Sequence, residues 1–143
     1  MKKSKFLLVM SIIALVIGVG DGISYFVMKS GITEDLISSL GGNAFAYSLS
    51  VIWTLAFAIS EIVSGVVGIL YWSRPDRISN CIQMGWQMII FTIVSTISGC
   101  IAIGAISGVL ASSVGVIVVS TVLDLIIPVL YLIAAYLFKK KAA

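Results

Sequence analysis

The stretch Ala44–Trp72, AFAYSLSVIWTLAFAISEIVSGVVGILYW, decides the fold class of this chain. Its apolar residues run continuously, without the alternation of a membrane-spanning β-strand. Glu61 is its only charged residue, and the stretch is long enough to cross a hydrocarbon core about 30 Å thick as a helix. The sequence therefore predicts a transmembrane helix over 44–72.

The rest of the chain repeats this pattern. A second apolar run covers 6–28, and the region from Ile78 to Phe138 contains no Lys or Arg. A cluster of Gly and Ser around 104–113 divides that region into helices expected at 78–106 and 112–138. We therefore predict an all-α polytopic membrane protein: a single domain over 1–143, a four-helix transmembrane bundle with up-down-up-down topology. A short outer helix is expected at about 34–40.

The composition excludes several classes of protein. Of the 143 residues, 60% are hydrophobic and only 10% are charged, whereas a soluble domain has about 25% charged residues. A water-soluble enzyme and a nucleic-acid binder are thereby excluded. The chain has no His for a hydrolytic triad, and Cys81 and Cys100 are too far apart on one helix to pair. We expect no enzymatic activity, no cofactor and no metal site.

The basic residues predict the orientation in a cell membrane. With four spans, eight of the nine Lys and Arg residues fall on the side of the two termini, and Lys29 falls on the other side. The positive-inside rule then places both termini in the cytoplasm. A competing interpretation treats residues 1–20 as a cleaved secretory signal. The full length of the first apolar run favours a retained helix.

Small residues at four-residue spacing are expected to pack the helices, because lipid gives helices little hydrophobic reason to associate. Such stripes either close the bundle or form a face for self-association, so the expected partners are the lipid bilayer and a second copy or another membrane protein. The packing residues expected from this pattern are Ala14, Gly18, Gly22, Ala56, Gly68 and Gly99.

Three acidic residues inside the predicted spans are the candidate functional site. Counting 1.5 Å per residue from the terminal side places Asp21 at roughly 22 Å, Glu61 at roughly 16 Å and Asp124 at roughly 21 Å. All three therefore lie near one level of the membrane, where a charged carboxylate costs about 2.5–3.5 kcal/mol. No Lys, Arg or His lies at that depth to neutralise them.

Three explanations of the acids stay open. They are protonated and join helices by hydrogen bonds, they form an ion or proton site, or they bind a basic residue of a partner protein. Pro128 cannot donate to the carbonyl of Asp124 four residues earlier, which leaves an extra oxygen acceptor beside that carboxyl. The supporting polar and helix-kink residues expected around the acids are Ser60, Ser64, Gln87, Ser120 and Pro128.

One part of the chain resembles known proteins. The segments Ser60–Trp72, Arg74–Cys81 and Gly85–Ile90 combine a Gly-rich second helix with a short basic Pro loop. This pattern resembles a class of uncharacterised small four-span bacterial membrane proteins. The layout is also similar to the membrane-spanning four-domain family, typified by a B-lymphocyte surface antigen. That resemblance implies cytoplasmic termini, four helices and self-association, but no catalytic or ligand residues.

The sequence leaves three functions open. The leading expectation is a non-enzymatic membrane protein that acts by self-association or as a subunit of a membrane complex. The second is a small cation- or proton-coupled transporter or channel that uses Asp21, Glu61 and Asp124. The third is an immunity protein against a membrane-active toxin.

Overall fold

The computed structural model describes residues 3–30, 44–104 and 110–143, and these residues form four long helices and one short turn of 3₁₀ helix. No strand occurs among the described residues. The predicted all-α fold is confirmed. The elements are α1 (Lys5–Ser30), α3 (Ala44–Tyr71), η2 (Pro75–Arg77), α4 (Ile78–Gly104) and α5 (Leu110–Ala142).

The helix bounds differ from the predicted ones mainly in α5, which begins at Leu110 and continues to Ala142 instead of ending at 138. Its last turn contains Lys139, Lys140 and Lys141. Cations at the C-terminus of a helix interact favourably with the helix dipole, so these charges extend the helix beyond its apolar run. The predicted outer helix at 34–40 lies outside the described residues.

All four helices are long and apolar enough to cross a membrane, which makes the chain a multi-pass membrane protein. Large apolar side chains cover the outside of the bundle, as lipid contact requires. The candidate spans are Lys5–Val27, Val51–Tyr71, Pro75–Ser98 and Val118–Ala142.

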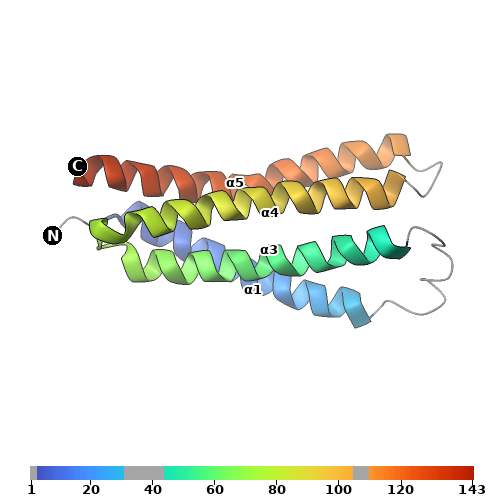
Figure 1. The fold of residues 1–143 in the computed structure, drawn as a ribbon, viewed down its shortest axis with the longest axis horizontal. Coiled ribbons are helices and arrows are strands. Elements are labelled where there is room, and N and C mark those ends of the chain that lie inside the picture. The colour runs from blue at the N-terminus through green and yellow to red at the C-terminus, as the bar shows by residue number, and fades with distance from the viewer. Residues whose placement is uncertain (1–2, 31–43, 105–109) are drawn as a thin grey trace.

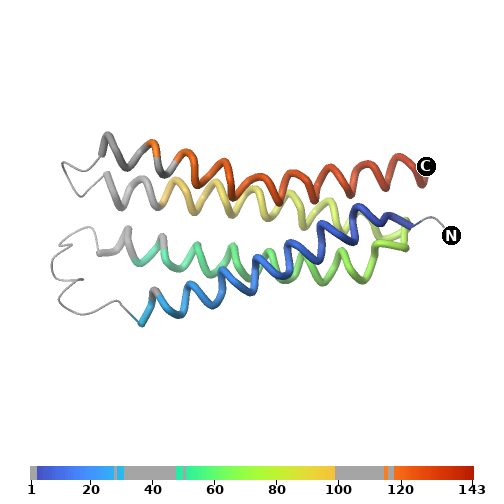
Figure 2. Tube along the Cα trace, turned by 180° about the vertical axis from the view of Figure 1, so that it is seen from behind, coloured from blue at the N-terminus to red at the C-terminus, as the bar shows by residue number. Residues whose placement is uncertain are grey.

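Consecutive helices run in opposite directions, and both chain termini lie at one end of the bundle together with the η2 turn (Figure 1). We call this the terminal end and the opposite one the far end. α1 packs beside α3, α3 beside α4 and α4 beside α5. Figure 2 shows α1 crossing obliquely, so that it is near α5 at the terminal end and well apart from it at the far end.

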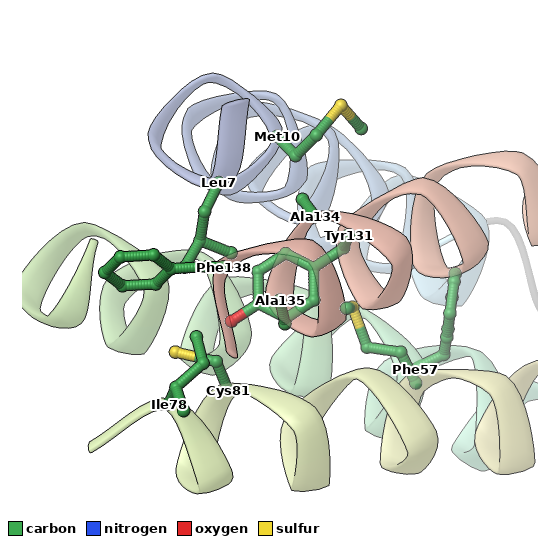
Figure 3. Packing of buried hydrophobic residues seen from close by; sticks show 10 residues of the cluster. Leu7, Met10, Phe57, Ile78, Cys81, Tyr131, Ala134, Ala135 and Phe138 are labelled. Carbon is green, nitrogen blue, oxygen red and sulfur yellow. The ribbon is translucent and has the colours of Figure 1, made fainter. Parts of the chain in front are cut away.

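The apolar core lies mostly toward the terminal end, where the first turns of α1 and α4 meet the last turns of α5 (Figure 3). Tyr131 and Phe138 are its largest members and are almost completely buried. The other residues of the buried cluster are Leu7, Met10, Phe57, Ile78, Cys81, Met88, Ala134 and Ala135.

Glycines bring α1 and α3 into close contact. A Cβ atom added to Gly18 would lie 2.9 Å from the Cβ of Glu61, and one added to Gly65 would lie 2.7 Å from the backbone oxygen of Ser11. Real Cβ atoms do not come this close, so these two positions must lack a side chain. Gly68 likewise faces Ser11 and the ring of Tyr131.

The other predicted packing residues vary in their surroundings. Ala14 is fully buried, whereas Gly22 has open space where a side chain would be. Ala56 is half-buried at the edge of α3, and the surroundings of Gly99 lie outside the described side chains. The pattern of small residues did not single out Gly65. Gly65 nevertheless approaches α1 as closely as Gly18 approaches α3.

Candidate functional site

The structure brings together the three acidic residues of the spans, which we call the acid cluster: Asp21 of α1, Glu61 of α3 and Asp124 of α5. The carboxyl groups of Asp21 and Glu61 are placed for a hydrogen bond between their side chains. Asp124 is close enough to interact electrostatically with both. Three helices thus contribute one carboxyl group each.

Gly18 explains why Asp21 can reach Glu61. Gly18 precedes Asp21 by about one helical turn, and its missing side chain lets the backbone of α1 approach the Cβ of Glu61. A larger residue at this position would separate α1 from α3 at the level of the acids. The close approach of the two helices therefore determines the distance between the two carboxyl groups.

Glu61 is the most enclosed member of the acid cluster, with only 2% of its surface exposed. Among the described residues, no hydrogen-bond partner reaches its buried Oε2 atom. Two ionised carboxylates can only accept hydrogen bonds, so a bond between Asp21 and Glu61 requires that one of them carries a proton. A hydrogen bond between them would therefore hold one proton between two carboxyl groups.

Asp124 is the most accessible member, since its side chain is exposed on α5. The buried Pro128 lies one turn farther along the helix and cannot donate a backbone hydrogen bond to the carbonyl of Asp124. On the preceding turn, Thr121 pairs with Thr96 of α4 through their hydroxyl oxygens, which are 3.1 Å apart. Ser120 is exposed and borders a mainly apolar hollow on the outside of α5.

Pro128 marks a change in the packing of α5. None of the described side chains of α5 before Pro128 is buried, whereas Tyr131, Leu132, Ala134, Ala135 and Phe138 after it all are. On α1, Gly20 and Gly22 have no atoms near the place of a side chain. The backbones of α1 and α5 also separate toward the far end (Figure 2), so we call the part of the bundle with the buried residues of α5 the closed half and the other part the open half.

The supporting polar residues do not all lie beside the acids. Ser60 and Gln87 border a groove of about 400 Å³ between α3 and α4, together with Ala56, Ile59, Val63, Met84 and Phe91. The hydroxyl of Ser60 is buried and has no hydrogen-bond partner among the described residues. Ser64 donates to the carbonyl of Ser60 at 2.6 Å and lies nearer the terminal end than the acids.

The described residues contain no group of three or more His, Cys, Asp or Glu side chains arranged to hold a metal ion. The three carboxyl groups of the acid cluster are therefore within electrostatic reach of one another without forming a coordination cage.

No protein-family model, curated protein or solved structure matches this chain. The resemblance to the membrane-spanning four-domain family stays a prediction that rests on the sequence segments alone.

Proposed function

We propose that the chain is a small proton-translocating membrane protein, a transporter or channel in which the acid cluster binds and passes protons. The observation that carries this proposal is the pairing of the half-buried Asp21 with the buried Glu61, whose carboxyl groups lie within hydrogen-bond reach across two helices. Acidic side chains inside a membrane are costly, and chains of them occur in proton relays of pumps and transporters.

The packing around the acids supports the same function. Asp124 is exposed on α5, in the half of the bundle where the backbones of α1 and α5 separate, and we infer that protons enter from the far end. Glu61 lies deeper and borders the closed half. An acceptor reached from one side and closed toward the other is the arrangement that alternating access requires.

The proposal includes an orientation of the bundle in the membrane. Lys139, Lys140 and Lys141 lie in the last turn of α5 at the terminal end, where Arg74 also precedes the η2 turn and Arg77 ends it. By the positive-inside rule this end faces the cytoplasm. The far end, from which we infer that protons enter, then faces the outside of the cell.

The test is proton flux into proteoliposomes that contain the purified chain, driven by a potassium diffusion potential. We expect wild-type protein to conduct protons and Glu61→Gln to lose at least nine-tenths of the flux. Asp76→Asn is the matched control, because Asp76 is an exposed acid at the terminal end that pairs with Arg77 at 3.6 Å. Absence of flux in wild type, or equal flux in wild type and Glu61→Gln, contradicts the proposal.

Self-association is a second candidate function, favoured by a different observation. The side chain of Asp124 is exposed on α5, and Gly20 and Gly22 leave open space on α1. A second copy packed there would shield the carboxyl from lipid. Native mass spectrometry from lipid nanodiscs tests this candidate: we expect dimers that Asp124→Leu dissociates, and a monomeric wild type contradicts it.

A further inference from the structure

A second polar group lies nearer the terminal end than the acid cluster, and each of the four helices contributes to it. Tyr131 of α5 is completely buried, and its hydroxyl donates to the backbone carbonyl of Ser64 in α3 at 2.8 Å. The hydroxyl of Ser11 in α1 and the thiol of Cys81 in α4 lie beside the same phenol oxygen. We call these four residues the tyrosine latch.

The tyrosine latch lies between the acid cluster and the terminal end. Tyr131 follows Asp124 by about two turns, or about 10 Å along α5, and Ser11 precedes Asp21 by about 15 Å along α1. Both displacements point toward the terminal end, because the chain termini lie there (Figure 1). A proton held by Glu61 therefore meets the ring of Tyr131 on a path to the terminal end.

The ring of Tyr131 fills the centre of the bundle at this level. A Cβ atom added to Gly68 would lie 3.1 Å from Cε2 of the ring, so α3 has no side chain where the ring passes. Leu7, Ile78 and Phe138 surround the ring on its terminal side (Figure 3). A displacement of this ring would therefore loosen the packing at the centre of the closed half.

We propose that Tyr131 is the gate at the terminal end of the proton path, closed when its hydroxyl is bonded to the carbonyl of Ser64. This inference rests on the proposed function, because a gate has a role only if protons pass through the bundle. It goes beyond that function in naming the closing residue and the bond that holds it. Cys81 can report on the gate, because its side chain is fully buried in the closed state and we expect movement of the ring to expose it.

The test measures how fast a charged, membrane-impermeant maleimide modifies Cys81 in lipid nanodiscs. Cys100→Ser is present in every sample, so that Cys81 is the only thiol. We expect Cys81 to be protected with the native tyrosine and to react at least fivefold faster in Tyr131→Phe, which keeps the ring and removes its hydroxyl. Tyr136→Phe is the matched control, because Tyr136 is an exposed tyrosine of α5 that accepts a hydrogen bond from Trp86 at 3.3 Å.

A latch with only a structural role gives a different result. Equal protection of Cys81 in Tyr131→Phe and Tyr136→Phe overturns the gate, and so does a Cys81 that reacts rapidly with Tyr131 intact. Should Tyr131→Phe not fold, a measurement without that substitution decides the question. In proteoliposomes, an applied membrane potential should speed modification of Cys81 from the terminal side at least twofold, and an unchanged rate overturns the gate.

Failure of the gate and failure of the proposed function are distinguishable. Flux that Glu61→Gln abolishes, with no effect of Tyr131→Phe on Cys81, retains the proton function and overturns the gate. Faster modification of Cys81 in Tyr131→Phe, in a chain without proton flux, overturns the proton function while supporting Tyr131 as the residue that closes the terminal end.

Discussion

Asp21 and Glu61 meet across the interface of α1 and α3, at the level where Gly18 lets the two helices touch. The acid pair and a packing residue are therefore parts of one local structure. The acids can share a proton only because the helix carrying Asp21 has no side chain at the closest point of contact. This coupling of packing to chemistry leads to several predictions.

Substituting Gly18 should disturb both the fold and the acids. Gly18→Ala places a methyl group 2.9 Å from the Cβ of Glu61 and from the backbone nitrogen of Ile62, which cannot move away easily. We expect a loss of about 1–3 kcal/mol of stability, typical of overpacking. The measurement is thermal unfolding in detergent. Gly20→Ala is the control, since nothing lies within 4 Å of its added methyl group, and equal losses in both variants would refute this account of the interface.

Gly85 lies in the interface of α4 and α5, where we expect a smaller loss of stability on substitution. A methyl group there meets Cδ1 of Leu132 at 2.8 Å, which is the far end of a flexible side chain. We expect Gly85→Ala to cost less than about 1 kcal/mol, because Leu132 can change its rotamer. Unfolding of Gly65→Ala, whose methyl group meets the backbone of Ser11, should occur at a clearly lower temperature. The reverse order would contradict the packing described here.

The hydroxyl pair of Thr96 and Thr121 joins α4 to α5 in the open half of the bundle. Thr96→Val should cost about 0.6 kcal/mol, the average for an interhelical hydrogen bond in a membrane protein. A double-mutant cycle with Thr121→Val, followed by unfolding, isolates the energy of the pair from the other contacts of each residue. A coupling energy near zero would show that the pair does not hold the two helices together.

The proposed topology predicts which thiol reagents can reach the end of the chain. In a variant with Ala143→Cys, Cys81→Ser and Cys100→Ser, the single thiol lies just beyond the basic last turn of α5. We expect an impermeant maleimide to modify it in inverted membrane vesicles and not in intact cells. Modification in intact cells would place the termini outside and reverse the direction proposed for the proton path.

The sequence predicted the depth of each site residue in the membrane better than the face of the helix on which it lies. Long apolar runs define the spans, and the rise per residue places Asp21, Glu61 and Asp124 near one level. Depth does not reveal how each helix is rotated. Gln87 has a suitable depth but borders the groove between α3 and α4, whereas Glu61 faces α1.

The role of Tyr131 could not be predicted from the sequence for the same reason. An aromatic residue in an apolar run is unremarkable until its neighbours are known, although its spacing of seven residues from Asp124 puts both on nearly the same face of α5. The close contact of Gly65 was also hidden, because many glycines in this chain have the same spacing and only some face a helix. Rotation and tilt come from the packing of all four helices together.

The central claim is that Glu61 takes part in a shared proton inside the membrane. Infrared spectroscopy of the chain in nanodiscs at neutral pH tests it most directly, because a protonated carboxyl group has a carbonyl stretch distinct from that of a carboxylate. We predict such a band in wild type and in Asp76→Asn, shifted in heavy water and missing in Glu61→Gln. A spectrum without this band, or one that Glu61→Gln leaves unchanged, would contradict the account.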